Sequence, residues 1–445
     1  MSEKMSVQSP AYAEVLLSLP WALPLEDWPD ELLAAYPRGI SRHTVRLISA
    51  GGMALAIKEI GESVAYHEYR TLKKLRDLDV PCVKPVAVIA HRTDDARDEE
   101  LTPCLVTEHL EFSLPYRDVF SRALGPETVN KLIRALAVLL VRLHLLNFYW
   151  GDVSLSNTLF RRDADEFSAY LVDAETGEFH EPLSKGRRLY DVEVARVNII
   201  GELMDLQAGG LIDTDVDVIS LGNAVDEIYH ELWGLMTEEL VVEGDAFGQI
   251  AEHIEKIQAL GFDIGETEIS HETRQARDDE GNPTGNNVDI YRVSIEPAVF
   301  STGFHRRKLK QLTGLDVQDR QAQRLLGEME VYRALHYDGE ISLEGVALDW
   351  LVNRYEPVVA LTPPALRAKL EPAQVFHEIL DHRWFVSENE ARYVRLDEAA
   401  ESYFRTILPD RPDEARIYTA DSHDISETAN GSEKPLDPTH PHNND

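Results

Sequence analysis

The sequence has little cysteine, no excess of basic residues and no long apolar run, and each absence narrows its possible roles. Its 445 residues include two cysteines, Cys82 and Cys104, without the paired spacing of a metal-binding motif. We therefore expect free thiols in a reducing compartment. Lys and Arg number 44 against 79 Asp and Glu, which gives a formal net charge of −35. Such a surface repels polyphosphates, so we expect no nucleic-acid partner and no anionic membrane surface.

The apolar segments are too short for membrane insertion. The most apolar one, residues 135–141, is flanked by Arg134 and Arg142 and is far shorter than a bilayer-spanning helix. The first residues, 1–7, contain no apolar core of a signal peptide. We therefore expect a cytoplasmic protein without a transmembrane segment. The composition, 43% hydrophobic and 28% charged, and the length predict two or three soluble domains.

The most informative stretch runs from residue 144 to residue 177. Asp152 is followed five residues later by Asn157, and two short strand-like runs then lead to Asp173. Phosphoryl transfer from a nucleotide needs one carboxylate for the attacking hydroxyl, and an amide and a second carboxylate for magnesium. An Asp and an Asn at this spacing also occur by chance, as an Asx-type turn that caps a helix. The apolar helix before Asp152 and the strand before Asp173 favour the catalytic interpretation.

A lysine and a glutamate upstream complete this pattern. Residues 43–48 and 53–58 read as a hairpin that ends at Lys58, and the helix predicted over 64–75 carries Glu68. An ion pair between Lys58 and Glu68 would fix the ammonium group on the α- and β-phosphates of a nucleotide. The simpler alternatives are an ordinary edge-strand lysine and a solvated helical glutamate.

The segments between these motifs also have readable patterns. We expect an extended segment at 80–83, a strand at 86–89, a charged loop at 92–100, and a strand at 104–110 that enters a hinge. Backbone groups around Glu108 and Leu110 at that hinge would contact the adenine. A long amphipathic helix over 127–146 leads toward Asp152. Its predicted core face consists of Leu132, Ile133, Leu136, Leu139, Leu140 and Leu143. A polar activation or substrate segment at 175–188 precedes helices at 191–206 and 218–240.

Taken in order, Lys58, Glu68, Asp152, Asn157 and Asp173 resemble the lipopolysaccharide-kinase branch of the protein-kinase-like superfamily. The resemblance covers about residues 40–240 and implies a two-lobed α+β fold that uses ATP with Mg²⁺ to phosphorylate a hydroxyl. It implies that Asp152 orients the nucleophile, that Asn157 and Asp173 bind Mg²⁺, and that Lys58, oriented by Glu68, binds the phosphates. The whole chain is similar to a bacterial family that pairs this region with a second domain of unknown role.

The chain departs from the protein-kinase pattern in three places. No Gly-x-Gly-x-x-Gly loop precedes the lysine, so Gly39–Arg42 or Gly51–Gly52 would have to cover the phosphates. Trp150-Gly151 replaces His-Arg before the catalytic Asp, and Asp-Ala-Glu replaces Asp-Phe-Gly, so eukaryotic-type activation switching is not implied. The substrate is not identified by these residues. A nucleotide-sensing pseudokinase and a nucleotidyl transferase remain as alternatives, although the presence of all five polar groups favours a working kinase.

These patterns predict four regions along the chain. They are an N-terminal strap at 1–36 with a short helix at 30–36, a kinase-like domain at 37–244 with lobes at 37–110 and 111–244, a mainly helical domain at 245–408, and a disordered acidic tail at 409–445. Within the third region, 266–274 and 288–295 read as a hairpin. Helices are expected at 250–260, 304–312, 317–335, 342–355, 364–370, 372–385 and 396–407. We interpret this domain as a partner-binding or scaffolding domain.

Two features of the C-terminal domain suggest ligands. The basic run 305–310 could receive a phosphate or an acidic partner, but a solvated helix face paired with nearby acids is the favoured interpretation. His377 and His382 resemble a zinc motif. However, their spacing of five places them on different faces of a helix, and we predict no metal there.

Overall fold

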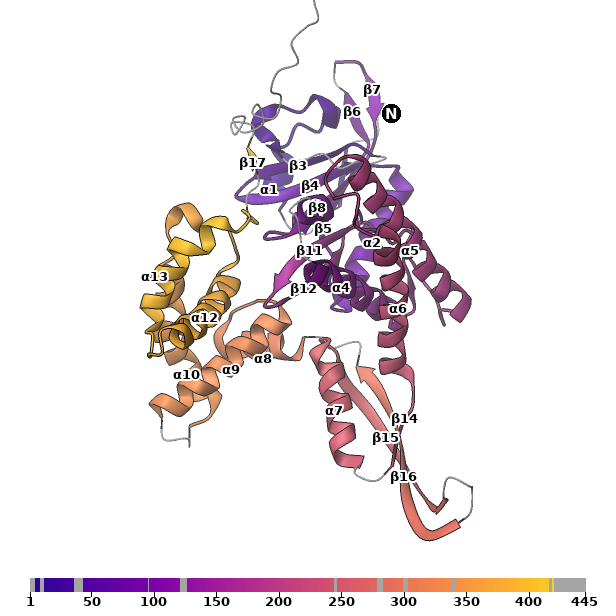
Figure 1. The fold of residues 1–445 in the computed structure, drawn as a ribbon. Coiled ribbons are helices and arrows are strands. Elements are labelled where there is room, and N and C mark those ends of the chain that lie inside the picture. The colour runs from indigo at the N-terminus through magenta and orange to yellow at the C-terminus, as the bar shows by residue number, and fades with distance from the viewer. Residues whose placement is uncertain are drawn as a thin grey trace, which may run out of the picture.

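The computed structural model in Figure 1 describes most of the chain. The described residues are 5–8, 12–35, 43–94, 96–120, 126–243, 246–277, 283–298, 303–337, 341–415 and 418–419. The candidate phosphate-covering segment Gly39–Arg42 lies outside them, as does the predicted tail beyond residue 419. The first part of that tail is structured, because Glu414 is buried and β17 (Tyr418–Thr419) pairs with β2 (Ala34–Ala35). The expected disorder is therefore wrong for the described residues 409–415 and 418–419.

The small lobe is built on one five-stranded sheet. Its strand order is β1-β5-β8-β4-β3, with bounds Ser6–Gln8, Lys84–Ala90, Cys104–Glu108, Met53–Glu59 and Val45–Ala50. The helix α2 (Glu62–Asp77) packs on one face through Ala65 and Tyr69, which contact Val88 and Leu105. The strands predicted at 86–89, 53–58 and 104–110 and the helix at 64–75 are thus confirmed.

The N-terminal strap covers the other face of this sheet. It contains α1 (Ala13–Leu17) and two 3₁₀ turns, Leu25–Asp27 and Asp30–Leu32. Trp21 and Trp28 are buried among the apolar side chains of the sheet. The short helix expected at 30–36 is wrong, because the chain leaves the second turn as strand β2.

The charged run at 92–100 is not a loop but a hairpin. It consists of β6 (Arg92–Asp94) and β7 (Glu99–Leu101). Arg92 is buried and donates to Glu59 Oε1 at 3.1 Å and to the carbonyl oxygen of Trp21 at 3.1 Å. These contacts connect the hairpin to the sheet and to the strap. They also give the buried guanidinium group of Arg92 its hydrogen-bond partners.

The large lobe is organised around α4 (Pro126–Leu145), whose predicted core face is fully confirmed as buried. It packs against α6 (Val218–Thr237) and the hairpin of β11 (Thr158–Asp163) and β12 (Glu166–Leu171), while α6 also packs against α5 (Lys185–Ala208). Shorter elements complete the lobe: β9 (Leu114–Pro115), α3 (Tyr116–Phe120), β10 (Phe148–Tyr149) and β13 (Glu178–Phe179). The predicted segment at 175–188 therefore ends inside α5.

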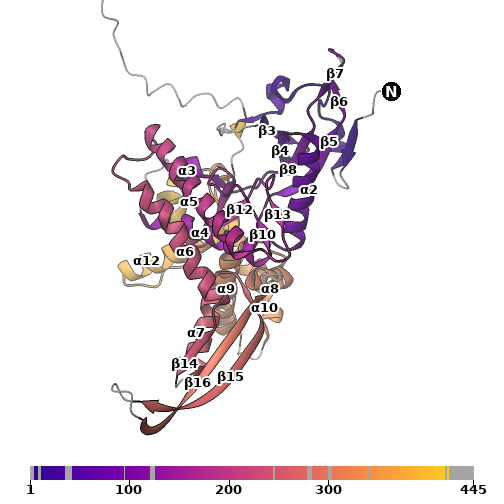
Figure 2. The ribbon, with the colours of Figure 1, turned by 90° about the vertical axis from the view of Figure 1, so that its right-hand side faces the viewer.

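A narrow arm follows the large lobe and projects away from it in both views (Figures 1 and 2). Its sheet has the order β14-β16-β15, with bounds Leu240–Glu243, Pro283–Ala298 and Asp263–Arg277. The helix α7 (Ala246–Ala259) packs against this sheet. The predicted hairpin is confirmed, and it is longer than the alternation of the sequence indicated.

The chain then forms a helical module with its own core. Its helices are α8 (Phe304–Thr313), α9 (Asp319–His336), α10 (Leu343–Trp350), α11 (Glu356–Ala360), α12 (Pro372–Asn389) and α13 (Leu396–Thr406). A π turn (Leu351–Tyr355) joins α10 to α11, and 3₁₀ turns lie at Pro364–Leu366 and Leu408–Asp410. Trp350, Phe376 and Tyr403 lie at the centre of the core. The two-lobed kinase-like fold with a mainly helical C-terminal domain is thus confirmed.

The helical module holds the tip of the β11–β12 hairpin. Gln374 on α12 accepts from the backbone N–H of Ala164 and donates to its carbonyl oxygen, both at 3.1 Å. The backbone N–H of Gln321 on α9 donates to Asp163 at 2.9 Å. Ion pairs flank these bonds, from Arg161 to Glu371 at 2.9 Å and from Arg162 to Glu414 at 2.6 Å. The hairpin therefore connects the large lobe directly to the second domain.

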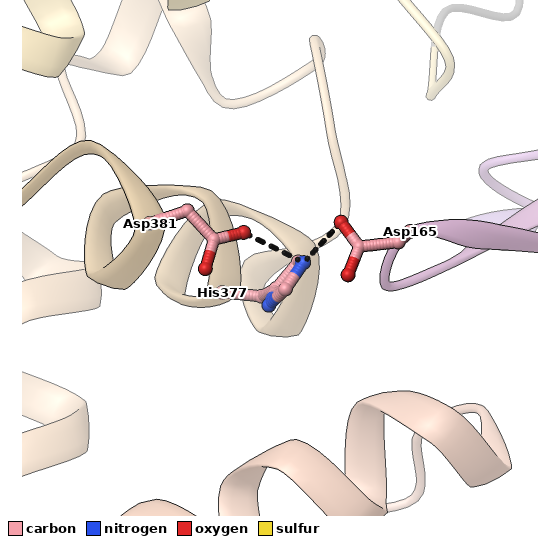
Figure 3. Close-up of side chains that lie close together, drawn as sticks. All are labelled: Asp165, His377 and Asp381. Atoms are coloured by element: carbon pink, nitrogen blue, oxygen red, sulfur yellow. Dashed lines mark hydrogen bonds and ion pairs between the residues drawn. The ribbon is translucent and has the colours of Figure 1, made fainter. Parts of the chain in front are cut away.

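His377 contributes to the same contact (Figure 3). Its Nε2 lies 3.4 Å from Asp165 at the hairpin tip and 3.2 Å from Asp381 one helical turn on. Arg324 donates to Asp381 at 2.7 Å and supplies a positive charge beside the cluster. His382 instead contacts Ser402 Oγ at 3.0 Å. The two histidines thus have different partners, as their spacing predicts.

Candidate active site

Lys58 lies at the centre of three carboxylates. Its Nζ is 2.6 Å from Asp173 Oδ2, 3.2 Å from Glu68 Oε2 and 3.2 Å from Glu175 Oε2. Glu68 comes from α2 and is almost fully buried, whereas the side chains of Asp173 and Glu175 are 30% and 32% exposed. The structure therefore brings together Lys58, Glu68 and Asp173, which the sequence predicted, and adds Glu175.

The charges of this cluster depend on one another. Burial lowers the pKa of Lys58, but attraction to the three carboxylates outweighs this effect and holds its pKa above the usual value. Burial raises the pKa of Glu68 to about 7, and repulsion by Asp173 acts in the same direction. The lysine is therefore charged at neutral pH, and a cationic ligand near Asp173 would relieve the repulsion between the carboxylates.

Asp152 and Asn157 lie together in the loop before β11. The Asn157 amide donates to the backbone oxygen of Asp152 at 2.9 Å and to its Oδ2 at 3.2 Å. The backbone N–H of Val172 donates to the Asn157 carbonyl oxygen at 3.0 Å. Since Asp173 follows Val172 directly, the base of the hairpin places Asn157 and Asp173 on adjacent chain segments. Both lie beside the loop that carries Asp152.

A buried aspartate holds this loop in place. Asp191 on α5 accepts the backbone N–H groups of Trp150 at 2.7 Å and Gly151 at 2.8 Å. It also accepts from His144 Nε2 at 3.1 Å, and Tyr229 then donates to His144 Nδ1 at 2.8 Å. Burial lowers the pKa of His144, so the ring stays neutral despite its bond to Asp191. Asp191 was not among the sequence-predicted site residues, because its partners lie about 40 residues away.

Steric contacts explain why glycine, and not arginine, stands at position 151 before Asp152. Its φ is +83°, and a Cβ atom there would lie 3.2 Å from the backbone oxygen of Thr176. Thr176 in turn donates its hydroxyl to the backbone oxygen of Trp150 at 2.7 Å. The segment after Asp173 therefore packs directly on the catalytic loop, and a larger residue before Asp152 would separate them.

Two more side chains support the loop that follows Asp152. Glu202 on α5 accepts the backbone N–H groups of Leu155 at 2.7 Å and Ser156 at 2.9 Å. Asn198, one turn earlier on the same helix, donates to the backbone oxygen of Val153 at 3.0 Å. The sequence pattern also missed these residues, because a polar side chain on an expected helix is normally solvated.

The register of the β3–β4 hairpin decides between the two candidate phosphate-covering segments. Lys58 pairs with Val45 at one end, and the Gly51–Gly52 turn closes the other end. At about 3.3 Å per residue, that turn lies roughly 20 Å from Lys58 along the strand. Gly51 also packs against the strap, since a Cβ atom there would lie 2.5 Å from Val15. The expectation that Gly51–Gly52 covers phosphates bound by Lys58 is therefore wrong.

The opposite end of the hairpin adjoins the acidic cluster. His43 lies two residues before β3, and its Nε2 is 3.2 Å from Glu175 Oε2. Gly39–Arg42, the other candidate, leads into His43. It remains the predicted covering segment, although it lies outside the described residues.

The strand β8 ends at Glu108, two residues before the predicted end at Leu110. The Glu108 side chain pairs with Lys84 at 2.7 Å, and the backbone N–H of His109 donates to Ala54 at 2.8 Å. The backbone oxygen of Leu110 accepts from Ser113 at 2.6 Å. The Glu108 carboxylate is thus occupied by Lys84, and adenine binding by backbone groups of Glu108 and Leu110 stays a prediction.

Comparison with known proteins identifies the two regions. Residues 53–188 match the lipopolysaccharide kinase (Kdo/WaaP) family. The N-terminal region is similar to a lipopolysaccharide kinase. This similarity confirms the resemblance that the five polar residues predicted, and it supports a kinase function. Residues 231–408 match a domain of unknown function, DUF4032, which spans the arm and the helical module.

A solved structure gives a more distant similarity. It is WaaP in complex with acyl carrier protein, with 17% sequence identity and a TM-score of 0.33, and the match covers 58% of this chain and 99% of that chain. No curated protein matches the chain. Within the described part of the chain, no helix has the length and apolarity needed to cross a membrane.

Proposed function

We propose that this chain is a kinase that transfers the γ-phosphoryl group of ATP to a hydroxyl group of its substrate. The observation that carries the proposal is the convergence of Lys58, Glu68 and Asp173 beside the loop of Asp152 and Asn157. Five polar groups from four separate chain segments would rarely meet in this order without a shared ligand. The family similarity of residues 53–188 supports the same activity.

The donor atoms fit magnesium. Asp173, Glu175 and Glu68 each offer a carboxylate oxygen, and these oxygens lie within 4.8 Å of one another. The Asn157 amide nitrogen faces Asp152, so its side-chain oxygen is left as a further donor. Magnesium prefers oxygen ligands and would supply neutralisation of phosphate charge when bound. Asp173 and Asn157 would hold it, with Glu175 beside them.

The remaining residues have roles that follow from their positions. Lys58 would leave Asp173 and bind the α- and β-phosphates, while the buried Glu68 keeps its ammonium group in the cleft. Asp152 would accept the proton of the substrate hydroxyl while the oxygen of that hydroxyl forms a bond to the γ-phosphorus. The bond from that phosphorus to the β–γ bridging oxygen would break, and ADP would leave. Asp191 would hold the loop of Asp152 in position through the backbone.

The direct test is phosphate transfer from γ-labelled ATP to components of a cell extract. A labelled product that forms with wild type and not with Asp152→Ala would support the proposal and would identify the substrate. Loss of a positioned base costs about a hundredfold to ten-thousandfold in rate. Asp226→Asn, on the partly exposed side of α6, is the matched control. Equal labelling by wild type and Asp152→Ala would contradict the role of Asp152.

A nucleotide sensor without transfer is the second candidate. The hydrogen bonds between the helical module and the tip of the β11–β12 hairpin favour it. Asn157 and Asp173 lie at the base of the same hairpin, so nucleotide binding there could change the contact at the tip. Both candidates require ATP binding, which we expect as a rise in melting temperature that magnesium increases. The sensor predicts this rise without any labelled product. An unchanged melting curve at millimolar ATP and magnesium would contradict both.

A further inference from the structure

The second candidate site is a cavity that lies against the β11–β12 hairpin. Its volume is about 320 Å³, which is the size of a small-ligand site. Its walls come from the end of α2, the middle of α4, the β11–β12 hairpin and the α8–α9 segment of the helical module. Lys58, Asp152 and Asp173 are not among the lining residues. Leu110 of the predicted adenine hinge does line it, so the cavity borders the nucleotide side of the candidate site, excludes the catalytic and phosphate-binding residues, and lies between the two domains.

Its lining is basic in a protein that is otherwise strongly acidic. Basic residues outnumber acidic ones there: Arg76, Lys131, Arg134, Arg142, Arg161, Arg306 and Arg320 face Asp79, Asp163, Glu166, Asp316 and Asp319. With a formal net charge of −35 over the chain, a local excess of cations around one cavity is unexpected. Positive charge gathered in a confined space favours an anionic ligand.

Three of these arginines lie in the electrostatic range of one tyrosine. Arg142, Arg161 and Arg306 come from α4, β11 and α8, and each interacts electrostatically with Tyr170 on β12. Arg161 and Arg306 also lie close enough to repel one another. Like charges held together from three elements cost free energy unless an anion lies between them.

Two of the guanidinium groups have unsatisfied atoms. Among the described residues, the Nε atoms of Arg142 and Arg161 are buried without a hydrogen-bond partner. Arg142 is 9% exposed, and burial lowers its pKa. The Nη2 atom of Arg142 donates to the backbone oxygen of Gly261 at 3.2 Å. A buried donor without an acceptor is destabilising, so these atoms call for a ligand that accepts hydrogen bonds.

The acidic residues of the cavity offset part of this charge but leave hydrogen-bond donors of the arginines unused. Asp316 is shared by Arg306 and Lys310, at 2.7 Å from each, and Asp319 pairs with His305 at 3.2 Å. Asp163 is enclosed at the hairpin tip, where it accepts from the backbone N–H of Gln321 at 2.9 Å. Arg161 pairs with the Glu371 carboxylate at 2.9 Å, and Glu371 lies outside the lining. Asp79 also interacts with Arg142 and Arg306, so the charges are partly balanced, but the buried Nε atoms of Arg142 and Arg161 still lack an acceptor.

We infer that this cavity is a second ligand site, which binds a small molecule bearing a phosphate or diphosphate group between Arg142, Arg161 and Arg306. Guanidinium groups recognise phosphate oxygens through paired N–H donors, and the free Nε atoms complete such pairs. The site adjoins the hairpin whose base carries Asn157 and Asp173. Its occupancy would therefore bear on the candidate active site and on the contact between the domains. The inference does not depend on the proposed kinase activity.

Calorimetric titration of the full chain with inorganic phosphate and with pyrophosphate, in EDTA, tests this site without magnesium. We expect saturable binding that Arg161→Gln and Arg306→Gln each weaken at least about tenfold, since each removes a charged donor. Lys256→Met, at an exposed position on α7 outside the lining, should leave the affinity unchanged. Melting curves of each variant check that it folds, and Arg161→Lys should recover part of the affinity because it restores the charge.

Matched variants separate loss of the ligand contact from loss of an ion pair. Glu371→Gln breaks the same ion pair as Arg161→Gln, and Asp316→Asn breaks the pair of Arg306, but both leave the cations in place. They should keep or increase the affinity. Equal loss in these variants and in the arginine variants would overturn the inference. So would loss of binding in Lys256→Met with retention in Arg161→Gln, or the absence of saturable binding for both anions.

Discussion

The two ends of the β11–β12 hairpin differ in how the protein treats their polar groups. At the base, Asp173 and Glu175 are about one-third exposed and share a single lysine. At the tip, Gln321 and Gln374 are almost fully buried and bond to the backbone of Arg162 and Ala164. Polar groups that stay accessible can exchange partners with a ligand, whereas buried and saturated ones fix geometry. One hairpin thus combines an adaptable end with a rigid one.

The largest effect is expected at the base. Asp173→Asn removes the charged ligand proposed for magnesium, and it should lower phosphate transfer by about a thousandfold because several kcal/mol of charge stabilisation are lost. The melting temperature of the free protein should change little, since Lys58 retains Glu68 and Glu175. Transfer assays and melting curves with and without magnesium measure the two effects. A collapse of stability with normal transfer would reverse the roles of base and tip.

The contrast between base and tip also explains what the sequence could predict. The site residues at the base could be predicted from the sequence, because Asp152, Asn157 and Asp173 follow a local order that phosphoryl transfer requires. The Lys58–Glu68 pair was readable because one residue ends a strand and the other lies ten positions on in a helix. The predicted helices and most strands followed from apolar periodicity, which is set by burial of one face.

The hydrogen bonds at the tip could not be predicted from the sequence, because their partners lie far along the chain. The polar residues between the two strand-like runs before Asp173 look like an ordinary turn, and Gln374 accepts from Ala164 across 210 positions. Asp191 was missed for the same reason, as a buried charge on a helix leaves no local pattern. The register of β3–β4, which excludes Gly51–Gly52 as the phosphate cover, likewise required the paired strands.

The next largest effect is expected at the tip. Gln374→Ala leaves the buried N–H and carbonyl groups of Ala164 without partners, and it should cost roughly 3 kcal/mol of unfolding free energy. Chemical denaturation measures the loss. Gln207→Ala is the control, because Gln207 also bonds two backbone oxygens but at an exposed position. If both variants lose the same stability, the tip is no more rigid than the surface.

A smaller, pH-dependent effect follows from Asp163. Burial raises its pKa to about 6, so the folded protein binds this proton more tightly than the unfolded chain does. Stability from this group is therefore present below its unfolded pKa and is lost as the pH rises through about 6. Asp163→Asn keeps the oxygen that accepts from Gln321 and removes the charge. It should stabilise the protein by on the order of 2 kcal/mol at pH 7.5 and hardly at all near pH 4.

Denaturation of wild type and Asp163→Asn across this range checks the sign. The difference between them should grow with pH and level off above the folded pKa. A constant difference would mean that the amide changes packing and that the charge of Asp163 has no cost at the tip.

The smallest effect is expected in the basic run on α8. Arg306 and Lys310 both pair with Asp316, in agreement with the favoured interpretation of paired acids, and Arg306 also lines the cavity of the second candidate site. Arg307 is exposed and is not among the lining residues, and neither is the partly exposed Lys308.

The double reversal of Arg307→Glu with Lys308→Glu should therefore change stability by less than about 0.5 kcal/mol and leave phosphate transfer unchanged. Transfer measured at low and high salt checks for long-range attraction of an anionic substrate, which screening over about 8 Å would weaken at physiological ionic strength. A rise in the Michaelis constant of the variant that disappears at high salt would show that this surface attracts the substrate. The helical module would then serve both ends of the hairpin, and the division between an adaptable base and a rigid tip would need revision.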